Sequence, residues 1–453
     1  MNAHRISIEN RSALASSDAA DVALDCLTAG IEAAHPRTVV SDTLSLDEAV
    51  LAVRSVDGAT ATYELDTYER VLVLGGGNAA GHFAAALEAL LGERIDGGAV
   101  VTDDPVETEH VEVLPGDHPV PSKRGVESAA RVLDLADCVG SDDLVIGCIT
   151  GGGSALLPAP AGELSLADLR TTTDALLASG APIEEINAVR KHLSAIKGGR
   201  LARAVAPATV VGLAISDVVG DDPAVIASGP LSPDSTTFRD TLDVLDRRDV
   251  DVPDPVREHL RAGAGGDFPE TPTADDTSFD RAAVHVVASA HTALDTAREV
   301  ATEHDYETMV LSARVRGEAR EAAKTHAAVA EEIATMGDPI ETPAIVLSGG
   351  ETTVTLGDDY GQGGPNQEFV LSGAVELGVP AVVAAVDTDG IDGATDAAGA
   401  IADADTVDDT AARDALSRND AYPVLENATA LLRTGATGTN VNDLRVLVVE
   451  ERQ

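Results

Sequence analysis

The sequence predicts an α/β protein with two domains, in which strands and helices alternate along the chain. Short, nearly uninterrupted apolar segments are separated by segments of helical composition, which is typical of parallel strands covered on both faces. Several of these segments run directly into glycine-rich turns, as strands do before a following helix. The chain has 453 residues, which is enough for two domains of ordinary size.

The elements of the first half favour a parallel sheet. A helix is expected to begin at Ser16–Asp18, whose side chains can cap it, and to end before Pro36. The first strong strand is Glu69–Leu74, and an alanine-rich helix after it extends to about Leu91. Three more apolar strands are expected at residues 98–102, 143–150 and 209–215. This order predicts an open sheet whose ligands bind outside the carboxyl ends of the strands.

Residues 262–280 separate the two halves. They are rich in Gly, Pro, Thr and Asp and have no periodicity, which is typical of a linker or an exposed loop. The alternation then restarts, with strands expected at residues 284–288, 308–311, 344–347, 381–386 and 444–449. We therefore expect one α/β domain at residues 1–265 and a second at residues 266–453, facing each other across a cleft.

The composition combines a globular core with a strongly acidic surface. The 77 acidic residues exceed the 31 basic ones and give a formal net charge of −46, while 44% of the residues are hydrophobic. No nucleic acid partner is expected, because polyphosphates need clustered Lys and Arg, and an acidic membrane surface would repel the protein. The acidic excess and the scarcity of lysine are typical of a salt-adapted cytoplasm.

Other features also favour a cytoplasmic protein. Cys26, Cys138 and Cys148 form no CxxC pattern, so buried thiols in a reducing compartment are expected rather than disulfides or zinc ligands. The N-terminus lacks a signal-peptide pattern, and no run of about eighteen apolar residues occurs that could span a membrane.

Two glycine-rich loops follow predicted strands and are candidates for binding phosphate groups. The first fits the pattern G-x-G-x-x-A, and the second has a hydroxyl at the start of its helix; they contain Gly75, Gly76, Gly77 and Asn78, and Gly151, Gly152, Gly153 and Ser154. Glycine lets a backbone approach a phosphate, and a helix N-terminus supplies N–H groups and a positive dipole. Two such loops indicate a ligand with more than one anionic group. The alternatives are tight turns without a ligand and a simple capping role for Ser154.

A cationic cluster lies at residues 187–200. Two of the chain's few lysines, Lys191 and Lys197, fall here beside Arg190 and Arg200. Such cations can bind phosphate or carboxylate groups. The alternative is a helix face that forms salt bridges with acidic surroundings.

Two acidic loops also follow apolar strands. Asp217 and Asp221 lie in the first loop, and Asp389 lies in the second, Asp387–Gly399, among Gly and Thr residues. Carboxylates at strand ends can hold Mg²⁺ and can orient or deprotonate a hydroxyl group during phosphoryl transfer. A calcium loop is not favoured, because the second loop lacks the later bidentate Glu.

Seven motifs occur in an order that resembles the class II glycerate kinase (glycerate 2-kinase) family, whose C-terminal part is called the MOFRL domain. They are ITGGGSALL, INAVRKHLSAIKGGRLA, SDVVGDDPAVIASGPLSPD, LSGGETTVTL, GGPNQE, DTDGIDGATDAAGA and TGTNVNDL, and the resemblance covers most of the chain from about Val71 to Val449. It implies a Rossmann-like N-terminal domain with a mostly parallel sheet, a smaller α/β C-terminal domain and an active-site cleft between them. It also implies ATP- and Mg²⁺-dependent phosphorylation of D-glycerate at its 2-hydroxyl, giving 2-phosphoglycerate. Together with the composition, the chain resembles a haloarchaeal member.

The resemblance suggests a role for each candidate residue. Arg190 and Lys191 would hold the acid or the transferring phosphoryl group, and Asp389 would orient or deprotonate the hydroxyl. Asp217 and Asp221 would bind Mg²⁺. The two glycine loops, with Ser154 and Lys197, would bind ATP.

Two positions depart from the family pattern. Asn78, in the first glycine loop, stands where the family often has a catalytically important Lys, and Pro365 stands where it commonly has Arg. Asn78 can still donate a hydrogen bond but carries no charge. Either Lys191, Lys197, Arg190 and Mg²⁺ supply the positive potential, or the substrate or activity differs from that of the family.

Two other functions are also consistent with the sequence. An NAD(P)-dependent hydroxypyruvate reductase would use the first glycine loop, with Asp103 binding the ribose, but it leaves the second glycine loop and the acidic loops unexplained. A non-catalytic ligand-binding relative would have kept the cleft and lost turnover. The expected partners are glycerate and a nucleotide, and the protein is expected to be a monomer or a homodimer.

Overall fold

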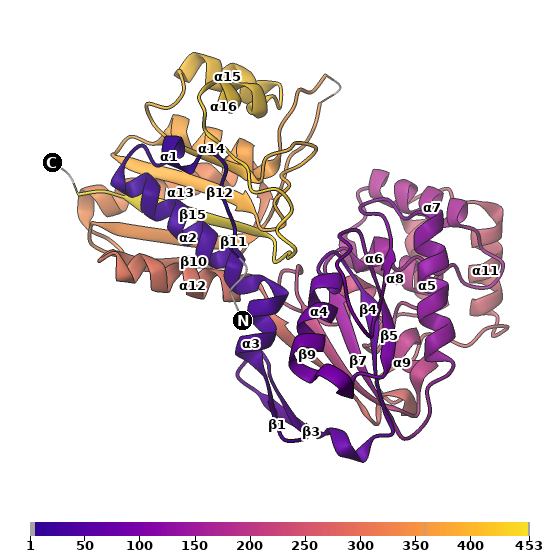
Figure 1. Ribbon diagram of the computed structural model, residues 1–453. Helices are drawn as coiled ribbons and strands as arrows, with labels where there is room; N and C mark the ends of the chain where they lie inside the picture. Colours follow the sequence, from indigo (N-terminus) through magenta and orange to yellow (C-terminus); the bar gives the residue numbers. More distant parts are fainter. Residues whose placement is uncertain (1–4, 358, 452–453) are drawn as a thin grey trace. The chain divides into compact units, whose positions relative to one another are not determined.

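The computed structural model describes residues 5–357 and 359–451. The chain forms two compact units (Figure 1): unit 1 comprises the described parts of residues 1–38 and 288–453, and unit 2 comprises residues 39–287. Each unit is an α/β structure with its own central sheet and apolar core.

These units divide the chain differently from the predicted domains. The expected boundary between residues 265 and 266 falls inside unit 2, and the first 38 residues belong to the unit of the C-terminal half. Residues 262–280 are part of unit 2, where Thr271 is buried and its hydroxyl donates to Asp234. More than half of the segment is exposed, as expected for a loop, but its buried residues tie it to unit 2 and it does not link the two units.

A six-stranded sheet forms the centre of unit 2, in the order β6-β5-β4-β7-β8-β9, and the pairs from β6 to β8 are parallel. The strands are β4 (Arg70–Gly76), β5 (Gly97–Thr102), β6 (Glu112–Pro115), β7 (Asp143–Thr150), β8 (Thr209–Ile215) and β9 (Ala282–Ala288). Numbered from β4, this is the Rossmann order 3-2-1-4-5-6, in which ligands bind where the strand order reverses. That point lies between β4 and β7. The predicted Rossmann-like parallel sheet is confirmed.

Some helices of unit 2 lie near this sheet, and others form a second apolar core. The helices near the sheet are α4 (Ala80–Leu91), α5 (Lys123–Ala136), α6 (Gly153–Leu156) and α9 (Arg200–Val205), while α3 (Pro36–Thr43) contains the boundary between the two units. A separate cluster around Phe238 joins α7 (Leu166–Ala178), α8 (Ile183–His192), α10 (Phe238–Arg247) and α11 (Asp254–Ala264). The sequence analysis did not predict a small antiparallel sheet of β1 (Leu44–Asp47), β2 (Val50–Arg54) and β3 (Thr60–Glu64).

A mixed six-stranded sheet forms the centre of unit 1, in the order β10-β11-β15-β12-β13-β14, with a parallel β10–β11 pair and antiparallel pairs beyond it. Its strands are β10 (Glu307–Glu318), β11 (Ala344–Thr353), β12 (Ala381–Asp387), β13 (Gly399–Asp403), β14 (Leu431–Leu432) and β15 (Asp443–Val449). Its helices are α1 (Arg11–Leu14), α2 (Asp18–Ala34), α12 (Ala290–Glu303), α13 (Ala319–Met336), α14 (Pro365–Glu376), α15 (Asp409–Ser417) and α16 (Ala421–Asn427). Helices α13 and α14 pack on the face that contains Val383 and Leu447.

Helix α2 explains why the N-terminal residues belong to unit 1. As predicted, Ser17 caps the helix, its hydroxyl oxygen accepting from the N–H of Ala20 at 3.1 Å. Figure 1 shows the indigo α2 lying along the orange and yellow elements of unit 1. Gly30 makes this packing possible, because a side chain there would overlap Leu444 of β15 and press against the backbone of Ala293 in α12. In the part of the chain that the structure describes, no helix is long and apolar enough to cross a membrane.

The parallel pair β4–β7 yields a test of stability. Gly75 has a φ of +154°, and a Cβ there would overlap the carbonyl oxygen of Cys148 in β7. We expect Gly75→Ala to lower the free energy of unfolding by about 3 kcal/mol or more, because overpacking adds to the cost of a positive φ. Gly58→Ala is the matched control, since Gly58 has a φ of +83° and open space around it, and should cost only about 1 kcal/mol. Thermal unfolding in molar KCl measures both, and equal losses would contradict this account.

Candidate active site

The two glycine loops lie side by side at the point where the strand order of unit 2 reverses. Strands β4 and β7 pair in parallel up to Gly76 and Ile149, so their following loops meet at the same edge of the sheet. The N–H of Asn78 donates to the carbonyl of Gly151 at 2.8 Å, and the N–H of Ala79 donates to Thr150 Oγ1 at 3.2 Å. The sequence placed both loops at strand ends, and the sheet order brings them together.

Close packing between these loops explains their glycines. A Cβ on Gly77 would overlap Thr150, a Cβ on Gly152 would overlap the amide of Asn78, and a Cβ on Gly151 would overlap the carboxylate of Asp217. Gly76 and Gly153 are also in close contact with neighbouring groups. The packing alone therefore requires residues without side chains, and nucleotide binding by these glycines stays a prediction.

Asn78 is held within the paired loops. Its Nδ2 donates to Asp103 Oδ2 at 2.8 Å, and its backbone carbonyl accepts from Thr102 Oγ1 at 2.8 Å. Its Oδ1 is buried, and no donor among the described residues reaches it. Asn78 does not line the cavity described next, so its predicted catalytic role rests on the sequence resemblance.

A cavity of about 420 Å³ opens beside the second glycine loop in unit 2. Gly152, Ser154 and Asp217 line one part of it, together with Arg190 at the end of α8 and Lys197. The remaining wall is largely apolar and includes Val120, Leu169, Leu176 and Leu177. We call this space the first cavity; its lining also includes His118, Arg170 and Asp174, so it combines charged groups with an apolar surface.

Arg190 and Lys197 place two cations close together in the first cavity. Lys197 is buried, and its Nζ donates to the carbonyl oxygen of Leu157 at 2.8 Å. Burial, and repulsion from Arg190, lower the pKa of Lys197 to about 7. Arg190 is partly buried, its pKa is lowered by burial, and its guanidinium has no hydrogen-bond or ion-pair partner among the described residues. The arrangement suits a carboxylate or a phosphate between the two side chains.

The two predicted metal ligands have different surroundings. Asp217 lines the first cavity and accepts from the N–H of Gly152 at 3.3 Å, and burial raises its pKa. Asp221 has a left-handed backbone with a φ of +58° and does not line the cavity. The described residues contain no group of three or more His, Cys, Asp or Glu side chains arranged to hold a metal ion. Asp217 thus lies on the first cavity and Asp221 does not, and metal binding by either residue stays a prediction.

A strained turn fixes Ser154, and the sequence analysis did not identify its partners. The hydroxyls of Ser154 and Ser228 lie 2.9 Å apart, and Ser228 donates to Asn187 Oδ1 at 3.1 Å. Ala227 and Ser228 both have positive φ values, which are unfavourable for residues with side chains and often mark functional sites. The turn is bound by Gly198 and Gly199, whose N–H groups donate to the carbonyls of Ser228 and Gly229. The sequence motifs ASGP and KGG lie next to predicted site residues, and they were the signal that could have indicated this turn.

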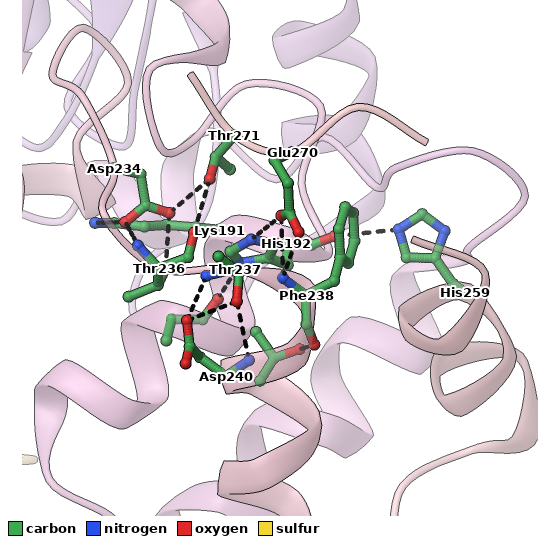
Figure 2. A network of polar contacts seen from close by, with 12 residues as sticks. Lys191, His192, Asp234, Thr236, Thr237, Phe238, Asp240, His259, Glu270 and Thr271 are labelled. Carbon is green, nitrogen blue, oxygen red and sulfur yellow. Dashed lines mark hydrogen bonds and ion pairs between the residues drawn. The ribbon is translucent and has the colours of Figure 1, made fainter. Parts of the chain in front are cut away.

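Lys191 lies in a buried ion pair and not on the first cavity. Its Nζ is 3.1 Å from Asp234 Oδ1, and the two residues are 7% and 2% exposed. Figure 2 shows Asp234 also receiving hydrogen bonds from Thr236 and Thr271. These contacts correspond to the salt-bridge alternative for the cationic cluster and do not support a substrate-holding role for Lys191.

The acidic loop of unit 1 gathers four carboxylates. Asp387 ends β12 directly opposite Asp443 of β15, and Asp389 and Asp392 follow it. Burial, with repulsion from Asp389 and Asp443, raises the pKa of Asp387 well above its ordinary value. Asp389 accepts from the N–H of Ile391 at 2.8 Å. Asp387, Asp389 and Asp392 all lie in the acidic loop expected from the sequence, in which Asp389 is the candidate residue, whereas Asp443 is brought in only by the pairing of β12 with β15.

Asp392 joins this loop to helix α14. Its carboxylate accepts from the N–H groups of Asn366 and Gln367 at 2.9 and 2.8 Å, and burial raises its pKa to about 7. Asn366 Nδ2 also donates to Asp443 at 2.6 Å. Pro365 is the first residue of α14, a position where the missing N–H of proline is not needed. This gives a structural reason for proline where the family commonly has Arg.

Comparison with protein families accounts for most of the chain. Residues 22–261 match the model of a domain of unknown function, DUF4147, and residues 344–443 match the MOFRL family.

Comparison with individual proteins identifies kinases with the same fold. The chain is 39% identical to the D-glycerate 2-kinase of Thermotoga maritima, over 88% of this chain and 94% of that protein. It is 35% identical to the glycerate 2-kinase of Pyrococcus horikoshii, over 96% of this chain and 98% of that protein. A protein of Agrobacterium vitis, provisionally named a hydroxypyruvate reductase, is 42% identical over 84% and 87% of the two chains.

A solved structure extends this likeness to three dimensions. The crystal structure of the glycerate kinase from Thermotoga maritima matches with a TM-score of 0.80 and 36% identity, covering 94% of this chain and 98% of that one. The matching sequence models, the curated relatives and the fold agree, and the chain belongs to the class II glycerate kinase family with its C-terminal MOFRL domain.

Proposed function

We propose that this protein is a glycerate 2-kinase, which transfers a phosphoryl group from ATP to the 2-hydroxyl of D-glycerate in the presence of Mg²⁺. The named relatives support the reaction. The pair of cations in the first cavity, Arg190 and Lys197, is the observation that supports an anionic substrate. The acidic composition supports a salt-adapted cytoplasm as the place where it acts.

An anionic ligand would relieve an unfavourable arrangement of charge. Two neighbouring cations in a partly buried site are unfavourable: burial, and then repulsion from Arg190, lowers the pKa of Lys197. A carboxylate could form two parallel hydrogen bonds with the guanidinium of Arg190 and stabilise the protonated form of Lys197. Glycerate carries such a carboxylate, and ATP and 2-phosphoglycerate carry phosphates, so each reactant has a group that fits.

Asp217 is our candidate for binding Mg²⁺. The donor set fits, because Mg²⁺ prefers oxygen ligands and usually uses one or two carboxylates together with waters and substrate phosphates. Asp217 lies on the same cavity as the cations, and its carboxylate is fixed by the N–H of Gly152. When bound, the ion would neutralise the charge on the transferring phosphoryl group. Ser154, fixed by Ser228, offers a hydroxyl donor on the same wall.

The acidic loop of unit 1 is our candidate for proton transfer. Asp389 would orient or deprotonate the 2-hydroxyl of glycerate, as the family resemblance implies. Its crowded surroundings support this role, because adjacent carboxylates can share a proton near neutral pH and release it later. Burial, and then repulsion from neighbouring carboxylates, raises the pKa values of Asp387 and Asp392.

An NAD(P)-dependent reductase is less well supported. Gly77 of the first loop packs against Thr150 and Gly151, and Asp103, the expected ribose ligand, accepts a hydrogen bond from Asn78.

The function is tested with D-glycerate, ATP and Mg²⁺ at molar KCl, by a coupled assay for ADP. ADP formation that requires D-glycerate supports the proposal. Oxidation of NADH or NADPH by hydroxypyruvate would support the reductase instead. Thermal stabilisation by ATP or glycerate without any product would indicate a non-catalytic relative.

Replacing Arg190 should weaken substrate binding. We expect Arg190→Gln to raise KM for D-glycerate about 10- to 100-fold, because a hydrogen bond to a charged group contributes about 1.5–3 kcal/mol. Arg239→Gln is the matched control, since Arg239 is exposed and lies outside the first cavity. Steady-state kinetics of both variants decide the matter, and an unchanged KM for Arg190→Gln would remove Arg190 from the site.

The charge of Lys197 should make activity depend on pH. With a pKa of about 7, Lys197 is protonated below this value and neutral above it. We therefore expect kcat/KM for D-glycerate, which reports the free enzyme, to fall by roughly tenfold between pH 6 and 9. Lys197→Gln should be less active and should lose this component of the profile. If the pH profile of Lys197→Gln shows the same fall in kcat/KM, the fall results from the titration of another group.

Lys191 should contribute to stability rather than to catalysis. Lys191→Met would leave Asp234 buried without its cation, and we expect a loss of about 3 kcal/mol in the free energy of unfolding. Lys324→Met breaks an exposed pair with Glu321, and should cost less than about 1 kcal/mol. Thermal unfolding compares the two. A Lys191 variant with normal stability and a strongly reduced kcat would restore the role expected from the sequence.

A further inference from the structure

Unit 2 contains a second cavity that the proposed kinase reaction does not use. It has a volume of about 340 Å³ and shares only Ser194 with the first cavity. Its lining is mainly apolar but contains Arg200 and Arg203, and it includes Ala195, His259, Phe268 and Pro269. The segment around Ser194 thus has a different cavity on each side.

Arg200 is a cation without a partner in this second cavity. Its guanidinium makes no hydrogen bond or ion pair within residues 5–357 and 359–451, and its Nε is buried. Burial, and repulsion from Arg203, lower its pKa. Arg203, in contrast, donates to the carbonyl of Glu270 at 2.9 Å and to Asp276 at 3.0 Å. Arg200 therefore retains donors for an outside anion.

This lack of a partner is unusual in so acidic a chain. With 77 acidic residues to 31 basic ones, most arginines of the described chain have an acidic partner. Arg190 and Arg200 are the two partly buried arginines of the described residues that have none and no other side-chain hydrogen bond. Each lines a cavity. An unpaired buried charge is unfavourable unless a ligand completes it.

Aromatic rings lie in the wall of the second cavity beside Arg200. The rings of His259 and Phe268 are stacked, with centroids 4.9 Å apart and an angle of 24° between their planes. Phe268 is 40% exposed, in a chain that has only five phenylalanines and no tryptophan. A flat apolar group could stack on this surface.

A hydrogen-bonded network holds the wall in place. Glu270 accepts from the N–H of Phe238 at 3.0 Å and lies 3.2 Å from His192 Nε2. The ring of Phe238 contacts His192 on one side and His259 on the other, with centroids 4.7 and 5.8 Å apart. Figure 2 shows this row of rings beneath Glu270, next to the buried pair of Lys191 and Asp234. The aromatic surface is thus preorganised for a ligand.

We propose that the second cavity is a binding site for a planar organic anion, distinct from the kinase substrates. The carboxylate or phosphate of the ligand pairs with Arg200, and its flat portion stacks on Phe268 and His259. Charge alone would favour any small anion, and the rings alone would favour any aromatic compound. The combination selects a ligand that carries both.

The test uses three probes: benzoate, which has a ring and a charge, inorganic phosphate, which has only the charge, and benzyl alcohol, which has only the ring. Ligand-observed NMR titration of the full chain should give an affinity for benzoate at least about tenfold above that for the other two. Equal affinities for benzoate and benzyl alcohol would overturn the proposal.

Variants locate the site and separate it from the first cavity. Arg200→Gln and Phe268→Ala should each weaken benzoate binding about tenfold, and the exposed position of Phe268 leaves the core intact. Arg239→Gln, exposed on α10, is the control for charge, and Arg190→Gln the control for the first cavity. Benzoate binding that survives both site variants, or that is lost only in Arg190→Gln, overturns the proposal. Neither result depends on kinase activity.

Discussion

The close contact between the ends of β4 and β7 is the constraint on which the candidate site depends. The two glycine loops approach so closely that a Cβ on Gly77 or Gly152 would overlap the neighbouring loop. This contact positions Gly152, whose N–H holds Asp217 on the wall of the first cavity. Glycine-rich loops in such folds are commonly explained by a bound phosphate. Here the packing of one backbone on another is already a sufficient reason for the glycines.

Most basic side chains that the structure describes are paired with acidic ones, and two partly buried arginines that are not paired lie at cavities. The large excess of carboxylates pairs with most of the cations, including Lys191, whose buried partner is Asp234. Among the described residues, the partly buried guanidiniums of Arg190 and Arg200 have no partner, and each lines a cavity. The absence of a partner in the folded structure is more informative about anion binding than the position of a scarce lysine in the sequence.

Unit 1 contains acidic side chains that lie close together and repel one another when ionised. Asp387 and Asp443 face each other across an antiparallel pair, which is unfavourable when both are ionised. Asn366 and Arg445 provide donors to Asp443, while Asp392 receives the first N–H groups of α14. The N-terminal end of this helix thus stabilises part of the acidic loop. Pro365, at the start of the helix, fits this local structure without the family's usual cation.

The sequence by itself determined most strands of the two large sheets, the capped helix α2 and the two glycine loops, because periodicity, caps and strand-to-helix turns are local signals. It did not reveal the short strands β6, β13 and β14. Only the tertiary structure decided that α2 belongs with the C-terminal half, that Asp234 neutralises Lys191, and that Asp217 but not Asp221 lines the first cavity. For the same reason, the sequence did not indicate the contacts made by Ser228, Asn187 and Asp443. These roles depend on contacts between residues far apart in the chain, which are set by how apolar faces and strand edges pack. A one-dimensional pattern does not contain that information.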